Sequence, residues 1–139
     1  MARWEARVER VLQNPPGSNK GLSAESIERS SIASFSKQSS WSIICEEVLD
    51  TQFPTTYFER ARQELLARGI TDTEIEEMRR LAWLTAGWLN FECGVWDWCG
   101  MDEKDIIQAI ETQYSERYIS AEERDHRVEF VRKYDTPRF

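Results

Sequence analysis

In the stretch from Asp72 to Phe91, DTEIEEMRRLAWLTAGWLNF, the pattern of apolar residues changes halfway along. The first half places Ile75, Met78 and Leu81 on one stripe at helical spacing, with charged residues between them. From Leu81 onward the stretch is apolar on all sides, as a helix is where it enters a protein core. The stretch therefore predicts a central helix over about residues 72–91, rich in tryptophan and leucine.

Capping residues mark further helix starts on both sides of this stretch. A side-chain oxygen at the N-cap accepts a hydrogen bond from the first turn, and an acidic residue three places later completes a capping box. Thr71 with Glu74 fits this pattern at the start of the central helix, and Asp102 with Asp105 fits it at the next helix. The same reasoning predicts starts at Ser23, at Thr56 with Glu59, and at Ser120 with Glu123.

Apolar residues that return every three or four positions predict the bodies of the other helices. Gly69 is placed to take the left-handed cap of a helix over about residues 57–68. Residues 41–45 fit a helix or a short strand, and their helical neighbours favour the helix. Nine serines among residues 23–42 leave the boundaries there open. The predicted stripes are Trp4, Val8, Val11 and Leu12; Phe58, Ala61 and Leu65; Ile107, Ile110 and Tyr114; and Val128, Val131 and Tyr134.

Length and composition complete the prediction of the fold class. A chain of 139 residues with only four prolines and six glycines fits one helical domain better than a turn-rich β-sandwich. We therefore predict an all-α, single-domain bundle of five to seven helices spanning residues 1–139, built around the helix at about 72–91.

The net charge of −7 is concentrated in one segment, because residues 72–111 hold ten acidic and three basic side chains. An acidic chain without a basic cluster is a poor match for nucleic acid and a better match for a basic partner or a cation. The longest mainly apolar run, residues 81–91, is too short to cross a membrane, for which roughly 20 residues are needed. The odd number of cysteines, three, and a start that does not resemble a signal peptide predict a cytoplasmic protein.

The cysteines and the single histidine do not suggest a metal centre. Cys93 and Cys99 are separated by five residues, whereas structural zinc sites usually space their cysteines two to four apart, and Cys45 and His126 are distant. Glu123 and His126 have the Glu-x-x-His spacing of a di-iron bundle, which needs a second such motif. We predict free, buried thiols, a solvated His126 and no cofactor.

One acidic spacing resembles a family motif. Helical nucleotide pyrophosphohydrolases of the MazG type bind Mg²⁺ through Glu-x-x-Glu followed by Glu-x-x-Asp, and Glu74 with Glu77 resembles the first element. Asp102 with Asp105 stands where the second would be and departs from it at the first residue. This resemblance implies an alternative function, a Mg²⁺-dependent enzyme that uses these four acids on nucleotides.

The tryptophans separate into two groups by position. Trp83 and Trp88 lie within the predicted central helix, where core packing is expected. Trp96 and Trp98 follow the helix and stand between glycines, where a loop can present them as interface anchors. A third alternative is a small-ligand pocket lined by Trp83, Trp88 and Trp96.

The leading functional hypothesis is a non-enzymatic interaction or regulatory protein with an acidic, tryptophan-bearing surface for a basic protein partner. Its oligomeric state is left open. The residues predicted to contact the partner are Glu92, Trp96, Asp97, Trp98, Asp102 and Glu103.

Overall fold

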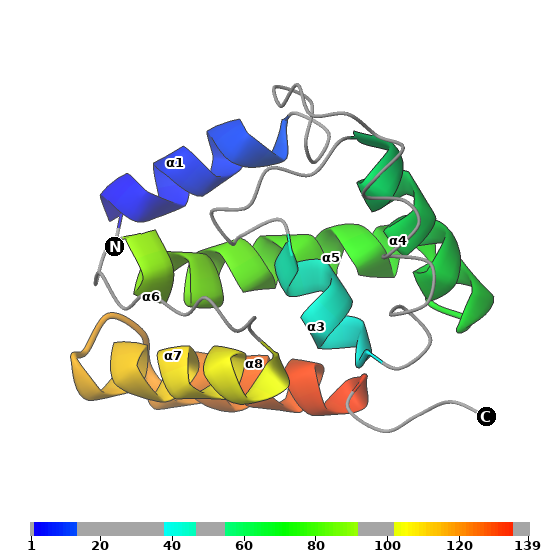
Figure 1. Ribbon diagram of the computed structural model, residues 1–139. Helices are drawn as coiled ribbons and strands as arrows, with labels where there is room; N and C mark the ends of the chain where they lie inside the picture. Colours follow the sequence, from blue (N-terminus) through cyan, green and yellow to red (C-terminus); the bar gives the residue numbers. More distant parts are fainter. Residues whose placement is uncertain (1, 14–37, 47–54, 92–101, 135–139) are drawn as a thin grey trace.

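The computed structural model describes residues 2–13, 38–46, 55–91 and 102–134, and every regular element in these ranges is helical (Figure 1). The prediction of an all-α bundle is confirmed. The described ranges contain six helices when the three consecutive elements of residues 72–91 are counted as one helix. No helix among these residues has the length and hydrophobicity to cross a membrane. The elements are α1 (Ala2–Leu12), α3 (Ser40–Cys45), α4 (Thr55–Ala67), α5 (Asp72–Ala82), the π-helical turn η2 (Trp83–Gly87), α6 (Trp88–Phe91), α7 (Glu103–Ser115) and α8 (Ala121–Lys133).

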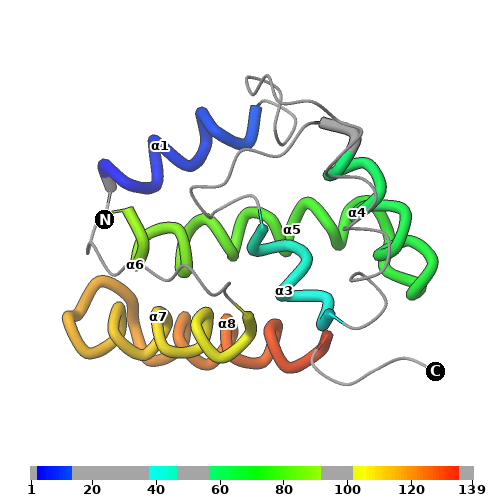
Figure 2. Tube along the Cα trace, in the orientation of Figure 1, coloured from blue at the N-terminus to red at the C-terminus, as the bar shows by residue number. Residues whose placement is uncertain are grey.

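The central helix runs through the middle of the molecule as α5, η2 and α6 in one continuous rod. Figures 1 and 2 show α1 on one side of this rod and the paired helices α7 and α8 on the other. Helix α3 crosses against α5, and α4 packs beside α3 and α5. The prediction of a central helix over residues 72–91 is therefore confirmed, while the single-domain organisation over residues 1–139 stays a prediction.

Capping residues set the helix starts where their spacing predicts them. Thr71 and Asp102 each accept from their helix's first turn, and both capping boxes are closed by the acid three residues later. Ser120 caps α8 by accepting from the backbone of Glu123 at 3.1 Å. Gly69 takes the left-handed conformation, with φ of +87°. The predicted start at Thr56 is wrong by a short distance, because α4 already includes residue 55, and the start at Ser23 lies outside the described residues.

The larger core cluster is centred on Trp41, which is completely buried. Its indole Nε1 donates to the carbonyl of Val131 at 2.9 Å, and its ring makes edge contacts with Phe130 and Tyr134. This packing confirms the preference for a helix at residues 41–45. The predicted stripe on α7 is wrong at Tyr114, which is 37% exposed and lies under the guanidinium of Arg124.

The smaller core cluster forms where η2 interrupts the central helix. Trp4 of α1 is buried there, and its Nε1 donates to the carbonyl of Trp83 at 2.9 Å. Gly87 allows this approach, because a Cβ at its position would lie 3.0 Å from the Trp83 ring and 3.2 Å from the Trp4 ring. Trp88 is buried as predicted, whereas Trp83 is half-buried and stacks on Phe91.

Candidate functional site

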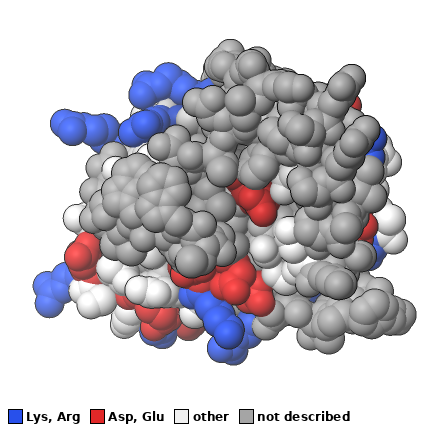
Figure 3. All heavy atoms as spheres, viewed as in Figure 1, with Lys and Arg blue, Asp and Glu red and all other residues white. Residues whose placement is uncertain are grey.

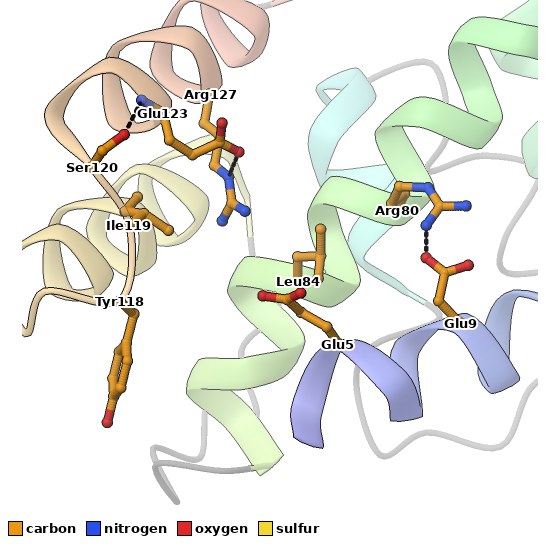
Figure 4. A pocket seen from close by; sticks show the side chains of 9 residues that line it. All are labelled: Glu5, Glu9, Arg80, Leu84, Tyr118, Ile119, Ser120, Glu123 and Arg127. Atoms are coloured by element: carbon orange, nitrogen blue, oxygen red, sulfur yellow. Dashed lines mark hydrogen bonds and ion pairs between the residues drawn. The ribbon is translucent and has the colours of Figure 1, made fainter. Parts of the chain in front are cut away.

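An open groove lies between α1, the central helix and the start of α8 (Figure 4). Its main cavity has a volume of about 490 Å³, and an adjoining hollow of about 330 Å³ shares Arg80, Leu84, Glu123 and Arg127 with it. We call these two cavities together the α1–α8 groove. The remaining lining residues are Glu5, Glu9, Tyr118, Ile119 and Ser120 in the main cavity and Glu77, Leu81, His126 and Phe130 in the hollow.

The floor of the groove is polar and connected to the core. Arg127 is buried, and its Nε donates to Glu123 while its Nη1 donates to Oε1 of Gln113, both at 2.9 Å. The amide of the fully buried Gln113 in turn donates to the carbonyl of Leu84 at 2.7 Å, inside the π-helical turn. A chain of hydrogen bonds therefore leads from the groove surface to the irregular turn of the central helix.

The rim of the groove is strongly acidic. A further cavity along α8 continues it and adds three carboxylates. Across the three cavities, seven carboxylates stand against two arginines, which leaves a formal charge of −5 with histidine neutral. The two arginines are Arg80 and Arg127, and the seven acids are Glu5, Glu9, Glu77, Glu122, Glu123, Asp125 and Glu129.

Four of these carboxylates, Glu5, Glu77, Glu122 and Glu129, have no ion-pair partner within the described part of the chain. Glu9 pairs with Arg80, and Glu123 pairs with the buried arginine of the floor. Glu5 and Glu77 make no such pair among described side chains, and both are exposed. The apolar Leu84 lines both cavities. The groove thus combines unneutralised negative charge with apolar surface.

Asp102 and Glu103, two of the six residues predicted to contact a partner, lie at the start of α7. Asp102 is the N-cap, and Glu103 accepts from the hydroxyl of Ser39 at 2.8 Å, so α7 is tied to the chain before α3. Both are half-buried. The other four, Glu92, Trp96, Asp97 and Trp98, lie outside the described residues.

Other carboxylates surround Cys45 at this junction of α3 and α7. Burial raises the pKa of the Cys45 thiol well above its ordinary value, and the charges of Asp105, Asp102, Glu46 and Glu103 raise it further. The thiol is free and buried, as predicted. Figure 3 shows acidic side chains over α7 on this face. Asp102 and Glu103, the described residues of the predicted acidic surface, therefore lie near Cys45 and outside the lining of the groove.

The four acids of the Mg²⁺ alternative are used in other ways. Asp102 and Asp105 close a capping box, and Glu77 lies at the rim of the groove. Glu74 accepts from the hydroxyl of Tyr134 at 2.6 Å. Within the described ranges, no three His, Cys, Asp or Glu side chains are grouped so that they could hold a metal ion.

Glu74 gives the fold a measurable sensitivity to acid. The hydrogen bond from Tyr134, followed by that from the Thr71 backbone, lowers the pKa of Glu74 from 4.5 to about 2. Because the folded-state pKa is below the unfolded one, this stabilisation is present above pH 4.5 and is lost as the pH falls towards 2. We expect Tyr134→Phe to destabilise the protein more at pH 6 than at pH 2.5 in urea unfolding. Tyr118→Phe, an exposed control, should show no such difference, and equal pH dependence in both variants would contradict the assignment.

Comparison of the chain with protein-family models, with curated proteins and with solved structures finds no match. The groove residues Glu5, Glu9, Arg80 and Arg127 were not expected from the sequence, because they come together only in the folded chain. One signal was present: Glu123 and Arg127 have the i,i+4 spacing of a helical ion pair.

Proposed function

We propose that this chain is a non-enzymatic interaction protein whose α1–α8 groove binds a basic segment of a protein partner. The observation that carries the proposal is the pair Glu5 and Glu77, two exposed carboxylates without described ion-pair partners, which line two adjoining cavities that share the apolar Leu84. Lysine and arginine side chains combine an apolar stem with a charged head, so they match such a surface. The formal charge of −5 around the groove favours their approach.

The predicted acidic surface, which runs from Glu92 to Glu103, remains a second contact region in this proposal. Its described part, Asp102 and Glu103, belongs to the carboxylates around Cys45. These carboxylates would extend the contact of a basic partner beyond the groove. No observation on the described residues favours the enzyme or small-ligand alternatives over this one.

The proposal is tested by titrating the full chain with a labelled amphipathic Lys/Leu peptide and following its polarisation. Neutralising two of the unpaired acids in a Glu5→Gln/Glu77→Gln variant is expected to weaken binding roughly threefold to tenfold, since surface ion pairs contribute about 0.2–1 kcal/mol each. Raising the salt concentration should weaken binding by the wild type more than by the variant.

Matched variants separate the groove from general charge effects. Glu59→Gln/Glu116→Gln removes the same charge from exposed positions on other elements, and its binding should equal that of the wild type. Glu103→Gln reports on the second contact region. If the groove variant and the matched control bind the peptide equally, the groove is not the binding surface and the proposal is wrong.

A further inference from the structure

Helix α1 sorts its charged residues onto two separate faces. Arg3, Arg7 and Arg10 follow one another at i, i+4 and i+7 and so form one stripe, while Glu5 and Glu9 are four apart on another face. No acid and base in the helix stand three or four residues apart, the spacing at which they would stabilise it. The like charges on each face instead repel one another. Opposite charge from outside the helix would therefore stabilise each face.

The acidic face has such a partner within the molecule, whereas the arginine stripe does not. Glu9 pairs with Arg80 of α5. The three arginines of the stripe are exposed, and no described carboxylate pairs with any of them. By contrast, six other arginines of the described chain each have a carboxylate partner: Arg62, Arg68, Arg79, Arg80, Arg124 and Arg127. Figure 3 shows basic side chains projecting over α1 at the edge of that view.

The middle arginine of the stripe is held in place by two aromatic rings. The Arg7 guanidinium lies 5.3 Å from the centroid of the Trp4 ring and 5.9 Å from that of the Phe91 ring. These two rings are themselves stacked, with centroids 6.4 Å apart and planes inclined by 27°. A guanidinium stacked on aromatic rings keeps its N–H groups available and loses less freedom when it binds a ligand. The stripe is thus partly ordered before binding.

We propose that Arg3, Arg7 and Arg10 form a binding surface for a carboxylate-bearing segment of a protein partner. The stripe extends over about 10 Å of helix, which fits two or three carboxylates about one helical turn apart. Planar guanidinium groups bind carboxylates through paired hydrogen bonds. Three cations fall short of the four to eight typical of anionic-membrane patches and of the many contacts made to a nucleic-acid backbone. The chain's net charge of −7 also repels an extended polyanion.

This surface is distinct from the groove, because it has the opposite charge and occupies another face of α1. The exposed Ala6 lies on the helix between the acidic and arginine faces. Binding of an acidic segment should therefore survive the loss of the groove carboxylates. Failure of one proposal leaves the other standing.

The test uses the full chain and a labelled alanine-based helical peptide with glutamates at i, i+4 and i+7, followed by polarisation at low salt. A Gln-for-Glu version of the peptide is the ligand control. The Arg3→Gln/Arg7→Gln/Arg10→Gln variant is expected to bind the acidic peptide roughly tenfold more weakly than the wild type does. Lys104→Gln/Arg117→Gln/Arg132→Gln removes the same charge from exposed positions elsewhere and should bind like the wild type.

A second variant distinguishes paired hydrogen bonding from charge alone. Replacing the three arginines by lysine keeps the charge and removes the planar fork, so an intermediate loss is expected. Circular dichroism establishes that each variant is folded. Glu5→Gln/Glu77→Gln should keep the affinity for the acidic peptide or raise it.

Three results would overturn the proposal. The first is equal binding of the glutamate and glutamine peptides to the wild type. The second is an equal loss in the stripe variant and in its matched control. The third is tighter binding, through the same arginines, of a 12-base-pair duplex or of phosphatidylserine vesicles, which would assign the stripe to phosphate groups.

Discussion

Replacing Gln113 with leucine is expected to lower the free energy of unfolding by about 2–4 kcal/mol. The side chain is completely buried and joins the Leu84 carbonyl to the Arg127 guanidinium, whose Nε donates to Glu123. Leaving a buried polar group unpaired costs about 1–3 kcal/mol, and more for a charged one. Leucine fills most of the volume but leaves both groups without this partner.

Urea unfolding followed by circular dichroism measures this loss. Gln108→Leu, at an exposed position on the same helix, is the matched control and should change stability by less than about 0.5 kcal/mol. Gln113→Glu separates the two hydrogen bonds, since a carboxylate still accepts from Arg127 but cannot donate to the Leu84 carbonyl. Equal stability of the two leucine variants would show that the hydrogen-bond chain has no energetic role.

Trp41→Ala is expected to destabilise the protein by about 3–5 kcal/mol, the range for removing a large aromatic side chain from a core. Trp41 is completely buried in the larger cluster and contacts the rings of Phe130 and Tyr134. Its indole also donates to the Val131 carbonyl. The substitution removes both the apolar contacts and the hydrogen bond that connect α3 to α8.

The two contributions are separated by Trp41→Phe, which keeps much of the ring and removes the indole N–H. Its expected loss of stability is smaller than that of Trp41→Ala. Ser42→Ala, at the next, half-buried position, is the control and should have a small effect on the midpoint of thermal unfolding. A Trp41→Ala variant as stable as this control would show that α3 does not need its tryptophan to dock.

The helices could be predicted from the sequence because their signals are local. A capping box such as Thr71 with Glu74 needs four adjacent residues, and the left-handed Gly69 needs only the helix that it ends. The π-helical turn has no comparable local signal. It depends on Trp4 and Gln113, which bond to its carbonyls from two other helices far away in the sequence.

The groove could not be predicted from the sequence, because six of its seven carboxylates lie outside residues 72–111, the segment in which the net charge is concentrated. Charge counting anticipated an acidic surface, and Asp102 and Glu103 do lie among carboxylates near Cys45. The groove combines Glu5 of α1 with Glu77 of α5, which are 72 positions apart in the printed sequence, so no spacing rule could join them. The prediction that Tyr114 lies on the buried face of α7 is wrong for a related reason. The helices that pack against α7 determine which of its faces is buried, and that face includes the polar Gln113.

The π-helical turn also changes the direction in which the second half of the central helix faces. A π-helical turn holds one residue more than an α-helical turn, so the residues beyond it lie about 100° from where a regular α-helix would place them. Before the turn, Met78 and Ala82 face the larger cluster, and after it Trp88 and Leu89 face the smaller one. A regular α-helix of the same sequence would turn its second half by roughly 100° from this direction. The irregular turn thus lets one unbroken rod supply two cores that lie in different directions.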